Sequence, residues 1–131
     1  MTYVDDLTPE VCHQLLGSSQ VGRVSFVDED GYPVIMPVNY RMHDGRIVVR
    51  TNAGTLLEQM PRHRVSFQVD ELSPDARRGW SVLARGSAVD MDLASDGDVR
   101  VDTWVPGDKG HWLSIVIADV TGRQIVNPTG A

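Results

Sequence analysis

The residues best suited to chemistry lie in the stretch 46–60. A β-branched run predicts a strand that ends on Arg50 and Thr51, and a glycine turn at 52–54 follows it. Thr55 then opens a Thr-Leu-Leu-Glu sequence that matches the capping box of a helix start. A guanidinium binds phosphate through two hydrogen bonds, and the unpaired N–H groups of a helix start favour an anion. The stretch therefore predicts a phosphate site. The alternative is an ordinary strand-to-helix connection with a solvated arginine.

Other residue types that carry chemistry form no recognisable site in the sequence. The four histidines and the single cysteine lack the short spacing of a zinc site, and the sequence has no Walker loop or Gly-x-Ser-x-Gly elbow. Cys12 and His13 are neighbours in a predicted helix, where adjacent side chains do not face each other. We therefore expect Cys12 to be a small core residue rather than a nucleophile, and we expect no metal.

Length and composition restrict the class of protein. The chain has 131 residues, of which 41% are hydrophobic and 23% are charged, as in a single globular domain, and we expect its core to span about 7–125. A net charge of −6 argues against a nucleic-acid or anionic-membrane surface. No apolar stretch approaches the roughly 20 residues that span a bilayer. One cysteine and no signal-peptide pattern predict a cytoplasmic protein.

Hydrophobic periodicity predicts mostly strands. A short helix is expected after Thr8, which can cap it. A polar loop is expected over 71–79, and one helical turn within 90–100. Strands are expected at 21–27, 32–40, 46–51, 64–70, 80–89 and 112–118, with 121–125 closing the fold. Six strands in hairpin order predict a mainly β protein, a small six-stranded antiparallel barrel with a few short helices.

Individual residues add detail to this barrel. Alternation places Phe67 and its neighbours at 65 and 69 on an inward face. Pro33 and Pro37 cannot donate to a ladder, so each must lie at an edge, a strand end or a bulge. Gly86 predicts a bend or bulge in its strand.

The ordered set of motifs resembles a known family. The segments that carry the resemblance are Gly22-Arg-Val-Ser-Phe, Asp30-Gly-Tyr-Pro, Pro37-Val-Asn-Tyr, Asp44-Gly-Arg-Ile, Arg50-Thr, Gly54-Thr-Leu-Leu, Val65-Ser-Phe-Gln-Val-Asp, Gly79-Trp-Ser-Val-Leu-Ala-Arg-Gly, Trp112-Leu-Ser-Ile and Thr121-Gly-Arg-Gln-Ile. They resemble the pyridoxamine 5′-phosphate oxidase-like flavin-binding split-barrel family, closest to its nitroimidazole-resistance-type branch. The resemblance runs from about residue 7 to residue 125.

The resemblance implies a split barrel that dimerises, with two FMN sites at the subunit interface. It implies that Arg50, Thr51 and Thr55 hold the flavin phosphate. It also implies that the strand segment Pro37, Val38, Asn39 and Tyr40 lies along the isoalloxazine ring and bonds its polar edge through backbone groups. Trp80, Ser81 and Trp112 are implied to line the site from the partner subunit. The expected function is that of an FMN-dependent oxidoreductase acting on an unidentified small molecule, since a flavin carries the electron chemistry itself.

One position departs from the family pattern. Relatives often have a phosphate-binding lysine after the Gly-Thr pair, whereas this chain has Leu56. A charge-assisted hydrogen bond is worth roughly 1.5–3 kcal/mol, so its loss costs about one to two decades of affinity. The site would then depend on Arg50, Thr51 and the helix start, with Arg62 or Arg64 as possible replacements.

Several alternatives remain open at this point. A reductase using the deazaflavin F420 would need a basic groove, for which the candidates are Arg41, Arg46, Arg50, Arg62 and Arg64. A non-catalytic module could hold a flavin, or a haem with His63 or His111 as axial ligand. Val38 and Tyr40 could belong to the barrel core, and Trp80 to an interface without a cofactor. The three tryptophans are many for so small a core, which favours a homodimer.

Overall fold

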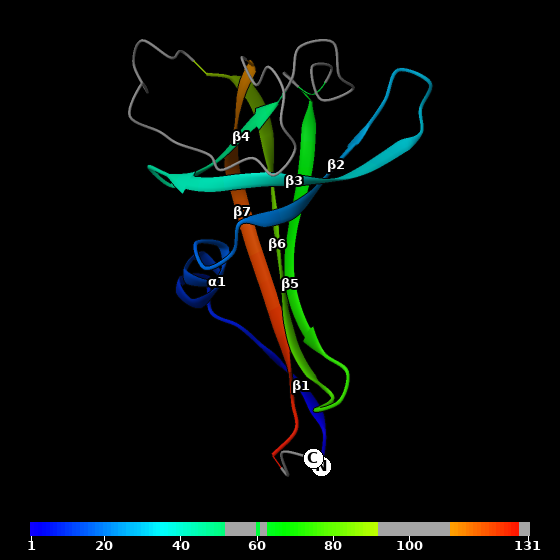
Figure 1. The fold of residues 1–131 in the computed structure, drawn as a ribbon, viewed down its shortest axis with the longest axis vertical. Coiled ribbons are helices and arrows are strands. Elements are labelled where there is room, and N and C mark those ends of the chain that lie inside the picture. Colours follow the sequence, from blue (N-terminus) through cyan, green and yellow to red (C-terminus); the bar gives the residue numbers. More distant parts are fainter. Residues whose placement is uncertain (52–59, 61–62, 92–110, 129–131) are drawn as a thin grey trace.

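The structure is a computed structural model that describes residues 1–51, 60, 63–91 and 111–128 (Figure 1). The described part contains strand β1 (Tyr3–Asp6), helix α1 (Pro9–Leu16), and strands β2 (Val21–Val27), β3 (Pro33–His43), β4 (Arg46–Thr51), β5 (Arg64–Ser73), β6 (Arg78–Asp90) and β7 (His111–Val126). The helix expected at Thr55 and most of the helical turn expected within 90–100 lie outside the described residues. No helix in the described part of the chain is long and apolar enough to cross a membrane.

Six of the strands close into a ring. Each pairs antiparallel with its neighbours in the order β7–β4–β3–β2–β5–β6, and β6 pairs again with β7. The predicted six-stranded antiparallel barrel is therefore confirmed. The hairpin turn at 28–31 and the one at 43–45 connect β2 to β3 and β3 to β4, as the sequence indicated.

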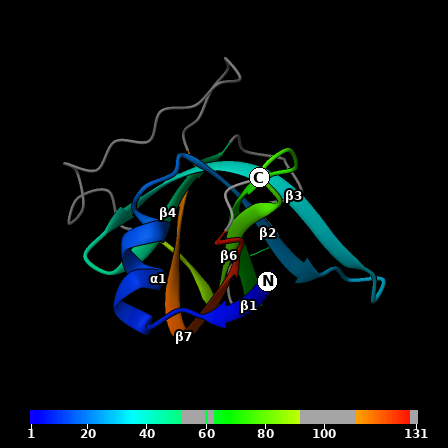
Figure 2. The same cartoon turned by 90° about the horizontal axis from the view of Figure 1, so that it is seen from below.

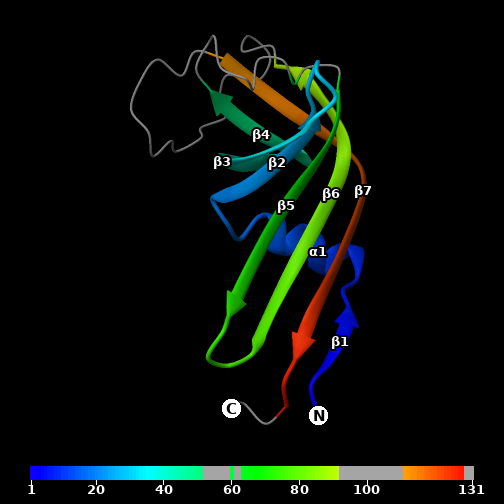
Figure 3. The ribbon, with the colours of Figure 1, turned by 90° about the vertical axis from the view of Figure 1, so that its right-hand side faces the viewer.

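Strand β1 was not expected. It lies outside the ring and pairs with the end of β7, from the Tyr3–Val126 pair to the Asp6–Arg123 pair (Figure 3). All four of its residues are exposed, so no burial pattern marks them as a strand in the sequence. Backbone hydrogen bonds to a neighbour that is distant in sequence create this element.

The ends of β5, β6 and β7 also differ from expectation. The predicted loop over 71–79 is wrong at both ends, because β5 continues to Ser73 and β6 begins at Arg78, which leaves a short hairpin. Residues 71–73 are polar or exposed, so the ladder that extends them leaves no hydrophobic signal. The segments expected at 112–118 and 121–125 are one strand of 16 residues. It passes from β4 at one end to β1 at the other and pairs with β6 over most of its length.

The irregularity predicted at Gly86 is confirmed, although the extra residue of the bulge lies in the partner strand β7. The register between β6 and β7 shifts between Arg85 and Gly86, which pair with Asp119 and Ile117, so Ala118 is the extra residue. A Cβ at Gly86 would lie 1.9 Å from the Val116 carbonyl oxygen, a distance that no side chain can adopt. Only glycine therefore permits the close approach that bends β6 around the barrel.

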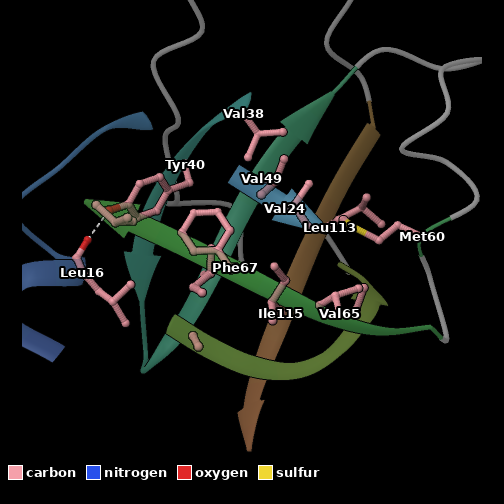
Figure 4. Close-up of a cluster of buried hydrophobic side chains, with 14 of the residues drawn as sticks. Leu16, Val24, Val38, Tyr40, Val49, Met60, Val65, Phe67, Leu113 and Ile115 are labelled. Carbon is pink, nitrogen blue, oxygen red and sulfur yellow. Dashed lines mark hydrogen bonds between the residues drawn. The ribbon is translucent and has the colours of Figure 1, made fainter. Parts of the chain in front are cut away.

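The inward faces of the strands form one core. Val65, Phe67 and Val69 are buried there, as their alternation predicted, together with inward residues of every strand of the ring (Figure 4). Phe67 packs edge-on against Tyr40, with ring centroids 4.8 Å apart. Its ring also fills the space beside Gly22, where a Cβ would lie 2.2 Å from the Phe67 Cζ. The core is therefore close-packed around this one aromatic residue.

Helix α1 covers one side of the barrel and packs against β7 (Figure 2). The Thr8 hydroxyl accepts a hydrogen bond from the Val11 N–H at 3.3 Å, which confirms the predicted cap. Cys12 and Leu16 are buried in the core. Burial raises the pKa of the Cys12 thiol, opposite to the lowered pKa of a reactive cysteine, so Cys12 acts as a small core residue.

Candidate functional site

Strand β4 presents two different faces. Ile47 and Val49 point into the core, whereas Arg46, Val48 and Arg50 alternate with them on the outer side of the barrel. On the neighbouring strand β7, Leu113 and Ile115 are inward, so Trp112 and Ser114 share the outer side with the β4 residues. We call the outer surface formed by Arg41, Arg46, Val48, Arg50, Trp112 and Ser114 the cationic face.

The predicted phosphate ligand Arg50 lies at one end of this surface, beside Trp112. Arg50 and Trp112 are paired across β4 and β7, and the Arg50 Cζ lies 5.1 Å from the centroid of the Trp112 ring. A guanidinium above an indole is held by the ring quadrupole, which fixes the direction of the guanidinium plane. The sequence placed both residues in the site. The resemblance implied that Trp112 lines the site from the partner subunit, which stays a prediction, and within one chain the ring supports Arg50.

Two more arginines extend the positive charge of the face. Arg41 of β3 pairs with Val48 of β4, and Arg46 lies before Val48 on the same side of β4. Arg41 and Arg46 are therefore both on the outer side of the barrel, and both are exposed. Neither guanidinium forms an ion pair within the described residues. Of the other proposed groove residues, Arg62 is outside the described residues and Arg64 lies on β5 in another wall. Three of the five arginines therefore gather on one face of a protein whose net charge is −6.

Among the described strands, none pairs with the β4 side of β3 over residues 33–39. Pairing with β4 begins only at Tyr40, while residues 33–39 pair with β2 on the other side. The Tyr40 N–H donates toward the β2 side, to the Gln20 carbonyl at 3.0 Å. By the alternation of a strand, the nitrogens of Pro33 and Pro37 point the opposite way. The prolines thus lie where a missing N–H breaks no strand ladder, as the sequence required.

The predicted ring-contact segment divides between two faces. Val38 and Tyr40 point into the core, whereas Pro37 and Asn39 lie on the outer side. The Tyr40 hydroxyl donates to the Leu16 carbonyl, and burial raises the pKa of Tyr40 to about 12, against a smaller lowering by a hydrogen bond with Ser19 (Figure 4). A ligand on the outer side could therefore contact Val38 and Tyr40 only through their backbone.

Trp80 and Ser81 lie far from Arg50 within one chain. Trp80 pairs with Gln124 near the opposite end of β7 and packs against the core, and Ser81 pairs with Arg123 on the outer side. The 11 residue steps from Trp112 to Arg123 span on the order of 35 Å of strand. These residues can share a site with Arg50 only if two chains meet, which is the arrangement that the resemblance implies.

The remaining predicted phosphate ligands are not described. Thr51 ends β4 opposite His111, and the structure gives no account of its side chain. Thr55 and Leu56, with the expected helix start, lie outside the described residues. The prediction that they contact phosphate is therefore untested.

Sequence reasoning missed Ser114. It lies on the outer side of β7, yet it is only 1% exposed and its Oγ has no hydrogen-bond partner in the described part of the chain. Ser114 borders a cavity of about 260 Å³ that is also lined by Val48 and Met91 and by the hairpin residues His43, Asp44 and Arg46, although its Oγ is buried. A serine alternating with apolar residues reads as a solvent-facing position, so nothing in the strand pattern could reveal its burial.

The donor set of the cationic face fits a flavin phosphate. An anion bound beside Arg50 would meet a guanidinium held by Trp112 and flanked by other cations, in an otherwise acidic protein. The flavin ring would lie toward residues 37–39, whose β4-side backbone no described strand covers. Arg50 would hold the phosphate, and the outer side of β3 would support the ring.

Comparison with known proteins agrees with this architecture. Residues 8–124 match the model of the pyridoxamine 5′-phosphate oxidase family. The uncharacterized protein Rv0080 of Mycobacterium tuberculosis is 33% identical over 132 residues, covering 94% of this chain and 86% of its own. A FAD-binding protein from Mycobacterium smegmatis has a similar structure, with a TM-score of 0.72, 27% identity, and coverage of 93% of this chain and 98% of its own.

A FAD-binding protein from Mesorhizobium loti shares the fold as well, with a TM-score of 0.74, 24% identity, and coverage of 97% of this chain and 100% of its own. The match to the family model covers nearly the whole barrel, and the closed six-stranded ring agrees with the split barrel that the motifs implied. This chain therefore belongs to the pyridoxamine 5′-phosphate oxidase family, as the order of its motifs indicated.

Proposed function

We propose that this protein is a flavin-dependent oxidoreductase that binds FMN, or the larger FAD, through the cationic face. The observation that carries the proposal is the Arg50 guanidinium stacked 5.1 Å from the Trp112 ring, between a strand edge that can accept the flavin ring and two further arginines. The FAD-binding relatives support a flavin as the ligand. The bound flavin would supply the electron transfer, and the substrate would be a small molecule.

The tasks left to this chain are binding and orientation. Arg50 would neutralise the phosphate, and Trp112 would fix the direction of its guanidinium, so that less side-chain entropy is lost when the anion binds. The outer side of β3 would hold the ring through backbone groups. No nucleophile or acid–base pair is needed for these tasks.

The decisive experiment is a titration of the wild type and of Arg50→Ala with FMN, followed by flavin fluorescence. Removal of one charge-assisted contact should weaken FMN binding by roughly 1.5–3 kcal/mol, whereas riboflavin, which lacks the phosphate, should bind both proteins equally. Leu56→Lys should tighten FMN binding, and circular dichroism should show the same fold for all variants. Equal FMN affinity in Arg50→Ala would place the phosphate elsewhere. A wild type that binds no flavin, with no rescue by Leu56→Lys, would end the flavin proposal.

Redox function needs its own measurement. Anaerobic addition of NADH or NADPH to the flavin-loaded protein should bleach the flavin absorbance if the protein is a reductase. A loaded protein that neither reductant bleaches would instead be a flavin-binding module, the non-catalytic alternative.

F420 is the second candidate cofactor. The arginines at 41, 46 and 50 form a basic surface of the kind that an acidic cofactor tail requires. Titration with F420 in parallel with FMN separates the two, because only one of them should bind at micromolar concentration.

We further propose that the protein acts as a homodimer. The outer walls of β2, β3, β6 and β7 carry an apolar face, defined by Val27, Ile35, Leu83 and Val116, which are 53%, 68%, 39% and 40% exposed. Two adjoining hollows lie on this wall and share Ser25 and Ser66. Trp80 and Trp112 pack within their own chain, and Trp104 lies outside the described residues, so this proposal does not rest on the tryptophans.

Sedimentation analysis tests the dimer. The wild type should sediment as a dimer at micromolar concentration, and Leu83→Arg should yield monomers, because it would bury an unpaired charge in the interface. Val4→Arg is the matched control, since Val4 is exposed on β1 and outside the apolar face. A monomeric wild type would contradict the dimer, and it would also remove Trp80 and Ser81 from any site shared with Arg50.

A cytoplasmic location is also proposed. Cys12 is a free, buried thiol, and no other cysteine exists to pair with it, as is usual in a reducing compartment. Fractionation of cells that express the tagged chain would test this location.

A further inference from the structure

The phosphate that Arg50 would hold carries more charge than one arginine balances. A phosphate monoester such as that of FMN has a charge of about −1.5 to −2 at pH 7. One guanidinium supplies a single positive charge, and each further charge-assisted hydrogen bond to the same group strengthens binding. We therefore expect a second cation within reach of a phosphate beside Arg50.

The register between β3 and β4 places Arg41 within that reach. Arg41 pairs with Val48, and Arg50 lies two residues beyond Val48 on the same side of β4. Arg41 and Arg50 are thus diagonal neighbours on adjacent antiparallel strands, a relation in which the Cα atoms lie about 7–8 Å apart and long side chains can meet. Both lie on the outer side of the barrel, so their guanidinium groups can contact one phosphate.

The two arginines approach that phosphate from different strands. Strand β4 lies between β7 and β3 in the ring. On the β7 side, Trp112 pairs with Arg50, and its ring centroid lies 5.1 Å from the Arg50 Cζ. Arg41 comes from the β3 side. Beneath them, Val48 is 1% exposed and packs with Trp112 and Met91, so an apolar surface supports the anion and strengthens its attraction to the guanidinium groups.

The described carboxylates leave Arg41 available for an anion. Arg41 is exposed and forms no ion pair in the part of the chain that the structure describes. The acidic residue of this hairpin is Asp44, whose Oδ2 lies 3.3 Å from the His43 Nε2. Asp44 follows the His43–Arg46 pair, at the end of the ladder that is opposite to Arg50.

Arg46 is less suited to the same phosphate. It precedes Arg50 by four residues on β4, which corresponds to about 13 Å of strand, and it lies next to the turn that carries Asp44. Its positive charge is therefore both more distant from Arg50 and closer to a carboxylate. Arg41 and Arg46 thus carry the same charge on the same face, but only Arg41 is within contact range of the proposed phosphate position.

We propose that Arg41 is the second ligand of the flavin phosphate and binds it jointly with Arg50 above Val48. The inference rests on the proposed function, because Arg50 must hold that phosphate. It assigns a direct contact to a residue of β3, outside the strand-turn segment 50–56, and it gives Arg46 only a long-range attraction. Arg41 then supplies the second positive charge that Leu56 cannot supply.

Fluorescence titration with FMN and with riboflavin tests the assignment. Arg41→Gln should weaken FMN binding about tenfold and leave riboflavin binding unchanged, because riboflavin lacks the phosphate. Arg46→Gln is the matched control: it removes the same charge from the same face and should weaken FMN binding less than about twofold. The difference between the two variants should persist at about 1 M salt, where the Debye length of about 3 Å suppresses attraction over the longer distance.

A double-mutant cycle shows whether the two arginines hold the same group. Residues that share one phosphate are coupled, so the loss of FMN affinity in Arg41→Gln/Arg50→Ala should differ from the product of the single losses by at least about threefold. The losses in Arg46→Gln/Arg50→Ala should multiply to within about twofold. Circular dichroism should show the same fold for every variant.

The outcomes separate this inference from the proposed function. If Arg50→Ala weakens FMN binding but Arg41→Gln and Arg46→Gln have equal effects that vanish at high salt, Arg41 is no ligand and the flavin site stands. An equal loss of FMN and riboflavin affinity in Arg41→Gln also overturns the assignment, since the phosphate would then not be its target. If the wild type binds no FMN, both proposals fail.

Discussion

The cationic face and the apolar face belong to the same barrel, but they differ in whether their arginines are paired with a carboxylate. On the cationic face, Arg41 and Arg46 have no carboxylate partner among the described residues, and Arg50 is held by a ring. In the wall that carries the apolar face, Arg85 makes a bidentate pair with Asp119, at 3.0 and 2.6 Å. Paired charges leave a nearly neutral wall that can contact another protein, whereas Arg41 and Arg46, which form no ion pair among the described residues, attract an anion.

The two faces also differ in the kind of partner that would cover them. The cationic face contains the buried Ser114 hydroxyl, which has no hydrogen-bond partner among the described residues, and the exposed arginines Arg41 and Arg46, which an anion would neutralise. The apolar face exposes valine, isoleucine and leucine side chains that a second protein surface would cover. One barrel therefore has a side suited to a small ligand and a side suited to a protein.

A substitution in the core that both faces share should have the largest effect, because it lowers the stability of the whole barrel. Phe67→Ala removes a fully buried ring that contacts Tyr40 and lies against Gly22, so it should lower the free energy of unfolding by about 3–5 kcal/mol. Urea denaturation measures the loss. Val4→Ala, at a position on β1 that is 58% exposed and outside the apolar face, should change stability by less than about 0.5 kcal/mol. Similar losses in the two variants would mean that Phe67 does not anchor the core.

Removal of the ring beneath Arg50 should weaken the cationic face alone. Trp112→Leu keeps the charge of Arg50 but removes a contact worth about 0.5–2 kcal/mol, so FMN affinity should fall by that amount. Fluorescence titration gives the affinity, and sedimentation should show an unchanged assembly. Tyr32→Leu, which replaces an exposed aromatic in the β2–β3 hairpin, is expected to have no effect on binding. Undiminished FMN affinity in Trp112→Leu would separate the indole ring from the site.

Alkaline pH should loosen the attachment of β3 to helix α1. Burial raises the pKa of Tyr40 from its ordinary value near 10 to about 12, so the folded state holds this proton more tightly than the unfolded state does. The stability contribution is complete below pH 10 and is lost as the pH rises toward 12.

Tyr40→Phe should remove this part of the alkaline dependence, at a cost of about 1 kcal/mol at neutral pH for the lost bond to Leu16. Urea denaturation from pH 8 to pH 12 compares the two proteins. Tyr32→Phe should retain the wild-type profile, and an identical alkaline slope in Tyr40→Phe would contradict the assignment.

The smallest effect is expected at the paired charge near the apolar face. Arg85 lowers the pKa of Asp119, first through the hydrogen bonds, so the pair stabilises the fold above the ordinary carboxyl range and loses that effect as the pH falls. Both groups are exposed and screened, so Asp119→Asn should barely change the free energy of unfolding at neutral pH. It should slightly weaken the fall of that free energy as the pH is lowered. Added salt should remove even this difference. A large loss at high salt would show that the pair is structural.

The sequence by itself determined the barrel, because strand alternation and hairpin turns are local. Inward residues such as Phe67, the Gly86 bulge and the Thr8 cap follow from patterns of a few residues, and Arg50 was found because a strand ending before a glycine turn is a local signal. The resemblance also gave the family correctly, since the order of motifs along the chain carries it.

Only the tertiary structure decided which residues from distant segments of the chain are neighbours. Strand β1 forms because it pairs with the end of β7. The indole of Trp112 lies under Arg50 because of the register in which β4 and β7 pair. Ser114 is buried by residues outside its own strand, so the pattern of that strand does not predict its burial. Periodicity specifies which side of a strand a residue occupies. Pairing between distant segments decides its neighbours, and the neighbours set whether a charge is paired or a hydroxyl is left without a partner.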